Sequence, residues 1–72
     1  MSKGMIVKYY KKDGSESKGI IRYSEQADVL HSTSKVMIRP CDDNFDVLKD
    51  DSGRELVTFK VLAFVRRIGY ID

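Results

Sequence analysis

The chain has 72 residues, of which 42% are hydrophobic and 33% charged, and its formal net charge is +2. These values predict one soluble domain over residues 1–72 and exclude repeat and low-complexity architectures. The small positive charge permits contact with nucleic acid or another anionic partner without requiring one.

The length of the apolar runs and the number of cysteines indicate in which cellular compartment the protein is expected. No run reaches the roughly 18 apolar residues of a membrane span, and Met1–Gly4 lead into a predicted strand without a signal peptide. Cys41 is the only cysteine, so an internal disulfide is excluded. We therefore expect a cytoplasmic protein without a membrane partner.

The first predicted element is a β-hairpin. Two apolar strands, residues 5–12 and 17–23, flank Asp13-Gly14. Asp-Gly favours a two-residue type I′ turn, which needs positive φ at both central positions. That turn predicts a register in which Lys8 opposes Gly19. One face of the hairpin then carries Met5, Val7, Tyr9 and Ile20, and the other carries Ile6, Lys8, Tyr10, Ile21 and Tyr23.

The middle of the chain is predicted as turns and short strands. Residues 24–34 form either a short helical turn through Ala27–His31, capped by Ser24, or a plain loop. Lys35–Arg39 is a strand ended by Pro40, which lacks a backbone N–H. Residues 41–44 form a turn, and a strand over residues 45–49 follows it. The turn Asp50–Gly53 closes a hairpin between that strand and the C-terminal run.

The C-terminal run, Glu55–Ile71, is the densest apolar stretch, and we expect the core to be built around it. A helix is one alternative, because Ser52 and Glu55 have capping-box spacing and Gly69 suits a helix end. Its β-branched and aromatic residues favour a strand instead, bent near Arg66–Gly69. The predicted fold is therefore mainly β, a small antiparallel barrel or curved sheet of about five strands, with an optional helical turn near residues 25–31.

Few residues suggest catalysis or metal binding. A zinc site needs several Cys or His ligands, whereas the chain offers only Cys41 and His31. The acidic pairs Asp42-Asp43 and Asp50-Asp51 lack the spacing of a calcium loop. No nucleophile, base and orienting group can be assembled, so we expect a non-enzymatic protein without a cofactor or a bound metal.

Basic and aromatic residues of the first hairpin point to nucleic acid, because small β-barrels bind it with cations for phosphates and rings for bases. Two arginines of the C-terminal run could extend this surface. In the alternative interpretation the tyrosines are half-buried strand residues and the lysines keep an edge soluble. The nine candidate residues are Lys8, Tyr10, Lys11, Lys12, Lys18, Arg22, Tyr23, Arg66 and Arg67.

Part of the chain also resembles a known family. Met5–Lys8 followed by Lys11–Gly14 is similar to the strand and turn that carry the catalytic lysine of LexA and phage-repressor type self-cleaving Ser–Lys peptidase domains. Residues 35–40, Phe45 and residues 59–71 resemble later strands of that family, so the resemblance covers about half of the chain.

The resemblance places Lys8 at the position of the family's base. The nucleophilic serine has no counterpart, because only Ser2 precedes Lys8 and its surroundings do not match. Residues 15–34 would be an insertion relative to LexA. The resemblance therefore implies a β scaffold that cannot cut itself and that serves dimerisation or partner binding, for example through Val61–Tyr70. This is the alternative to a nucleic-acid-binding module.

Overall fold

The computed structural model describes residues 3–25 and 34–71. These residues form one antiparallel sheet with the strand order β4-β3-β2-β1-β5 and contain no α-helix. The strands are β1 (Gly4–Tyr10), β2 (Glu16–Arg22), β3 (Lys35–Cys41), β4 (Thr58–Val61) and β5 (Arg66–Ile71), with 3₁₀ turns η1 (Tyr23–Glu25) and η2 (Leu62–Phe64). The predicted mainly β class with about five strands is confirmed. The alternative turn through Ala27–His31 lies outside the described residues.

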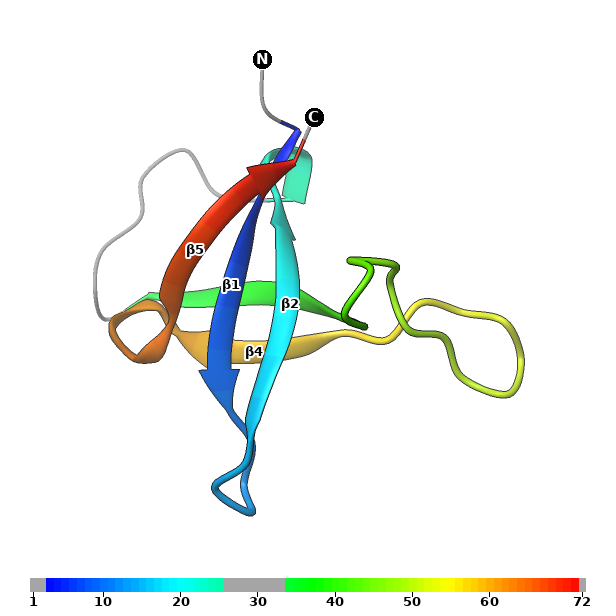
Figure 1. Ribbon diagram of the computed structural model, residues 1–72, viewed down its shortest axis with the longest axis horizontal. Helices are drawn as coiled ribbons and strands as arrows, with labels where there is room; N and C mark the ends of the chain where they lie inside the picture. The colour runs from blue at the N-terminus through cyan, green and yellow to red at the C-terminus, as the bar shows by residue number, and fades with distance from the viewer. Residues whose placement is uncertain (1–2, 26–33, 72) are drawn as a thin grey trace.

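The sheet is curved so strongly that it forms two layers. Figure 1 shows β5, β1 and β2 running side by side, with β3 and β4 crossing them at a steep angle. The two layers are continuous through the β2–β3 pairing. The core lies between them and consists of Met5, Val7, Tyr9, Ile21, Val36 and Ile38, with Leu62 and Val65 packed against it.

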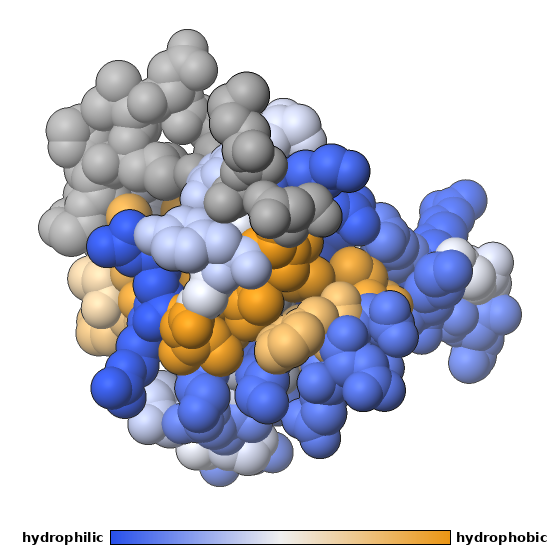
Figure 2. Space-filling model, turned by 45° about the horizontal axis from the view of Figure 1, so that its top comes forward, coloured by the Kyte–Doolittle hydropathy of each residue, from blue (hydrophilic) through white to orange (hydrophobic). Residues whose placement is uncertain are grey.

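The C-terminal run does not form the core, contrary to our prediction. No residue from 55 to 71 is buried, and the side chains of Phe59 and Phe64 are 60% and 75% exposed. The reason is position: β4 and β5 are the two edges of the sheet, so each has only one neighbouring strand. Figure 2 shows hydrophobic side chains reaching the surface between hydrophilic ones; Ile68 of β5 is one of the exposed apolar residues.

The extended conformation predicted for this run is confirmed, and the helical alternative is wrong. The chain breaks at η2, earlier than the bend expected near Arg66–Gly69. That region contains an irregularity instead, since the β1–β5 register shifts between Ile6 and Val7, which pair with Gly69 and Arg67.

The register of the first hairpin differs by one residue from the prediction. Lys8 opposes Lys18 rather than Gly19. The loop has three residues, because the Lys11 N–H donates to the Ser15 carbonyl at 2.8 Å and only Gly14 has a positive φ. A one-residue shift exchanges the faces of a strand. Ile21 therefore lies in the core cluster, and Ile20 moves to the opposite face beside Ile6, where both residues are still buried.

Residues 42–57 form an arm that projects from the body (Figure 1). The strand predicted over residues 45–49 is absent; the arm has only two isolated bridges, Cys41 with Val47 and Lys49 with Glu55. Both predicted turns are present, each closed by an aspartate side chain. Asp42 Oδ1 accepts from the Asn44 and Asp46 N–H groups, and Asp50 Oδ1 accepts from those of Ser52 and Arg54.

Pro40 does not end β3, as we had expected, but pairs with Gly19 inside it. Its carbonyl accepts from the Leu48 N–H at 2.9 Å, so the polar groups of this residue face the arm and not β2. The missing N–H therefore leaves the β2–β3 ladder intact.

Candidate nucleic-acid interface

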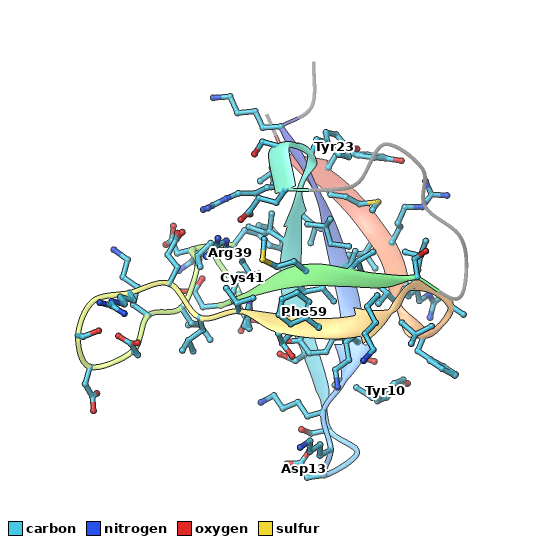
Figure 3. The ribbon with its side chains drawn as sticks, turned by 180° about the vertical axis from the view of Figure 1, so that it is seen from behind. Tyr10, Asp13, Tyr23, Arg39, Cys41 and Phe59 are labelled. Atoms are coloured by element: carbon cyan, nitrogen blue, oxygen red, sulfur yellow. The ribbon has the colours of Figure 1, made fainter. Side chains whose placement is uncertain are left out.

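The nine predicted residues do not form one surface. In Figure 3, Tyr23 lies at the end of the molecule where the chain termini are, and Tyr10 lies near the opposite end, close to the hairpin tip. Three groups result: an outer row on the sheet, a cavity near the termini and a groove beside the hairpin tip.

The outer row consists of Lys8, Lys18 and Arg66, which are direct cross-strand partners on β1, β2 and β5. Two of the three cations are neutralised. The Lys8 ammonium lies 3.1 Å from Glu16 Oε1, and the Lys18 ammonium lies 3.3 Å from Asp43 Oδ1. Arg66 has no acidic partner among the described residues. Tyr10, opposite Glu16, continues the row and is 63% exposed.

The cavity near the termini is about 440 Å³ in volume and is lined by Lys3, Arg22, Tyr23, Ser24 and Ile71. Its arginine is already engaged, because the Arg22 guanidinium donates to both carboxylate oxygens of Glu55 at 2.9 Å. Arg67 lies apart from all three groups and is exposed, with its guanidinium 3.5 Å from the Tyr70 hydroxyl.

The groove beside the hairpin tip is the most basic of the three. It has a volume of about 330 Å³ and is lined by Tyr9, Lys11, Lys12, Ser17, Pro40, Leu48, Leu56, Thr58 and Lys60. No acidic residue lines it. None of its three lysines, Lys11, Lys12 and Lys60, forms an ion pair with any described residue. The three ammonium groups around the groove are thus not held in ion pairs, and Asp13, whose pKa is lowered by hydrogen bonds from Ser15 and also by Lys11, interacts with Lys11 only at longer range.

The groove is lined by three elements and by Pro40 of β3. The hairpin supplies Tyr9 and the two tip lysines, β4 supplies Thr58 and Lys60, and the arm supplies Leu48 and Leu56. The Lys60 ammonium lies 5.9 Å from the centre of the Tyr9 ring, within the range of a cation–π contact. The site therefore combines positive charge and hydroxyl groups with two apolar side chains, Leu48 and Leu56, which we call its apolar floor.

Sequence reasoning found the two tip lysines but missed Lys60 and the apolar floor. The signal that could have identified Lys60 is the alternation of apolar and polar side chains in the C-terminal run. Lys60 stands between Phe59 and Val61, so it must project to the opposite face of the strand. That face looks toward the hairpin, because Lys60 and Thr58 oppose the core residues Val36 and Ile38.

An ion cluster anchors the base of the arm beside the groove. Glu55 pairs with Arg22 and lies 3.6 Å from Arg39, which also donates to both carboxylate oxygens of Glu25. Hydrogen bonds from Arg39 hold the pKa of Glu25 below its usual value, and hydrogen bonds from Arg22 do the same for the pKa of Glu55. The ion cluster holds Glu55 in place, and it thereby positions the neighbouring Leu56 in the apolar floor of the groove.

Charge is unevenly divided between the arm and the body. Six of the eleven acidic residues lie between positions 42 and 55, where only two of the thirteen basic residues lie. The remainder of the chain therefore carries eleven basic and five acidic residues. Outside the arm, basic residues therefore exceed acidic ones by six, an excess that the net charge of +2 conceals.

Other chemistry has little support. Cys41 is 6% exposed, and burial raises the pKa of its thiol, which disfavours the reactive thiolate. In residues 3–25 and 34–71 no three His, Cys, Asp or Glu side chains gather closely enough to hold a metal ion. The same residues include no helix with the length and apolar character needed to traverse a bilayer.

Comparison with known proteins returns no matching family model, curated protein or solved structure. The resemblance to LexA-type peptidase domains stays a prediction. Lys8, which the resemblance places at the position of the family's base, is 37% exposed, pairs with Glu16 and opposes Lys18.

Proposed function

We propose that this protein is a small binding module for single-stranded nucleic acid and that the groove beside the hairpin tip is its binding site. The observation that carries the proposal is the meeting of Lys11, Lys12 and Lys60 beside the apolar side chains of Leu48 and Leu56, with none of the three lysines in an ion pair with a described residue. The single cysteine suits a reducing compartment, so the proposal includes a cytoplasmic setting.

The two parts of the groove suit the two parts of a nucleotide. Phosphate oxygens would accept hydrogen bonds from the lysine ammonium groups and from the Ser17 and Thr58 hydroxyls. An unstacked base would lie against Leu48 and Leu56, which are 40% and 38% exposed and line the groove. Bases in a duplex are already stacked and paired, so a groove of this kind favours a single strand.

The outer row of Lys8, Lys18 and Arg66 is the competing surface, and the groove is preferred on electrostatic grounds. A phosphate approaching Lys8 or Lys18 must first displace Glu16 or Asp43. A phosphate approaching the groove displaces only water and small counterions. Counterion release is the main source of affinity in such contacts, and it is smaller where a carboxylate already neutralises the cation.

The test is a salt titration of binding to a fluorescent single-stranded oligonucleotide. With three lysine–phosphate contacts, log K should fall with log salt at a slope of about 2, since each contact on a single strand contributes about 0.7. Lys11→Glu/Lys12→Glu removes two contacts and reverses two charges. We expect this variant to lose at least about tenfold in affinity at low salt and to have a slope below about 1.

Two matched variants separate the groove from general charge. Lys3→Glu/Lys35→Glu changes the net charge equally at positions outside the groove, and Lys8→Glu/Arg66→Glu changes it equally in the outer row. Both should retain most of the affinity. If the outer-row variant loses binding and the groove variant does not, the site is misplaced. If the wild-type chain does not bind at low salt, the proposed function is wrong.

A further inference from the structure

Within residues 3–25 and 34–71, strand β4 has one edge that pairs with no other strand and presents a defined set of backbone donors and acceptors. It is the last strand of the sheet, and β3 is its neighbour. The Leu62 N–H donates to the Ser34 carbonyl at 2.8 Å. This bond shows which alternate residues of β4 direct their backbone groups toward β3. Because antiparallel pairs alternate, Thr58 and Lys60 also direct their N–H and C=O groups toward β3. Those of Phe59 and Val61 therefore point to the open edge.

The side chains along this edge form an apolar row. Phe59 opposes Met37, on the face of the β3–β4 layer turned away from the core residues Val36 and Ile38. Phe59 is 60% exposed, and Val57, two residues earlier in the chain, is 41% exposed. In Figure 3, where β3 and β4 lie in front of β1 and β2, Phe59 is seen on β4. An exposed apolar edge strand is a template for pairing with another strand.

Strand β4 and the residue before it read Val57-Thr58-Phe59-Lys60-Val61, which is symmetric in character about Phe59. A second antiparallel strand of the same sequence, related by a two-fold axis at Phe59, places the two phenylalanines opposite each other. Val57 of each copy then opposes Val61 of the other, and Thr58 opposes Lys60. Every apolar residue meets an apolar one, and no two like charges are opposed.

The same symmetry selects the register. Moving the two-fold axis by one residue, to Lys60, would oppose two ammonium groups at the centre of the interface. With the axis at Phe59, the outward N–H and C=O groups are those of alternate residues, so the Phe59 pair becomes a hydrogen-bonded pair of an antiparallel ladder. A two-fold contact of this kind uses the same surface on both subunits.

We propose that the partner of the β4 edge is a second copy of this chain, joined through antiparallel β4–β4 pairing centred on Phe59. Each copy contributes five strands, so the dimer has one continuous sheet of ten strands. The proposed dimer depends only on the geometry and sequence of the β4 edge. One consequence rests on the proposed function: Thr58 and Lys60 line the groove, so pairing brings the grooves of the two copies together on one side of the joined sheet.

Sedimentation equilibrium over a wide range of protein concentrations tests the proposal. Wild-type protein should follow a monomer–dimer equilibrium. Phe59→Lys places two ammonium groups at the two-fold axis and should weaken the dimer by at least about tenfold. Phe64→Lys is the matched control, because Phe64 is also exposed but lies in η2, beyond the strand. It should leave the dimer unchanged. A wild-type chain that remains monomeric at millimolar concentration would overturn the proposal.

Hydrogen exchange on the unmodified chain reports the register directly and does not depend on how a variant folds. The amides of Phe59 and Val61 should become protected as the concentration rises, whereas those of Thr58 and Lys60 should be protected throughout by β3. Uniformly fast exchange at Phe59 and Val61 would contradict β4 pairing. Lys11→Glu/Lys12→Glu should dimerise normally, so failure of the dimer and failure of nucleic-acid binding are separate results.

Discussion

Strands β1 to β3 and the C-terminal run both contain many apolar residues, but only the first three strands bury them. Strands β1 to β3 supply Val7, Ile21 and Ile38, whose side chains are at most 1% exposed. The C-terminal run is richer in apolar residues, yet it leaves Phe59 and Phe64 largely in solvent. Central strands have two neighbours and a crossing layer above one face, whereas edge strands have one neighbour. Burial here follows place in the sheet and not hydrophobicity.

The difference has a functional meaning. A chain of this size has little apolar surface to spare, because it buries only about 60% of what its unfolded state exposes. Exposed large apolar residues that gather along an edge are typical of interaction surfaces. The buried residues that the structure describes come from β1, β2 and β3, and we propose that the C-terminal run supplies surfaces for contact with other molecules.

The largest expected contrast comes from truncating one side chain in each half. Ile38→Ala should reduce the free energy of unfolding by about 2–5 kcal/mol, because it leaves a cavity in the core. Phe64→Ala should change it by no more than about 0.5 kcal/mol, because the ring is mostly solvated. Urea denaturation followed by circular dichroism measures both values. Equal losses for the two variants would contradict the division of the sheet.

A smaller effect is expected where β2 approaches the core most closely. A Cβ added at Gly19 would collide with Ile38 Cγ2 and lie 3.2 Å from a ring carbon of Tyr9. Gly19→Ala should therefore cost about 1–3 kcal/mol of unfolding free energy through overpacking.

Gly69→Ala on edge strand β5 is the matched control for Gly19→Ala. Its new Cβ would meet Ile6 Cδ1 at 3.8 Å, an ordinary contact. Denaturation midpoints should separate the two variants. If both alanine substitutions are tolerated equally, β2 and β3 are not packed as closely as described.

The smallest effect should be the pH dependence that the ion cluster provides. Arg39 holds the pKa of Glu25 below its unfolded value of about 4.3. A carboxylate whose folded pKa is depressed stabilises the protein above the unfolded pKa, and this contribution disappears as the pH falls through the folded pKa. Wild-type stability should therefore fall between about pH 5 and pH 3.

Arg39→Gln should be less stable at neutral pH and should lose less stability over the same acidic range. Arg67→Gln serves as the control, because Arg67 has no acidic partner in the described part of the chain. Melting temperatures measured at several pH values give the comparison. Parallel pH profiles for wild type and Arg39→Gln would show that the cluster does not couple protonation to folding.

Local structure was largely predictable from the sequence. The β-branched and aromatic content of residues 55–71 indicated strands, and the turns at Asp13-Gly14, Asp42 and Asp50 were found. The register was not, because Asp-Gly is compatible with two- and three-residue loops and the difference is a single hydrogen bond from Lys11 to Ser15.

The arrangement in space was harder to foresee. Nothing local distinguishes an edge strand from a central one, so the apolar C-terminal run was mistaken for the core. The same limit applies to the groove. Lys11 and Lys60 are far apart in the sequence, and only the crossing of the hairpin over β4 brings them to one site. The tip lysines were found because they are adjacent in a turn.

The most direct test of the central claim is a chemical-shift map of the isotopically labelled chain, titrated with a short single-stranded oligonucleotide. If the groove is the binding site, the amide shifts should concentrate at the hairpin tip and along β4, at Lys11, Lys12, Ser17, Thr58 and Lys60. Shifts that follow Lys8, Lys18 and Arg66 instead, or a spectrum unchanged at saturating oligonucleotide, would contradict it.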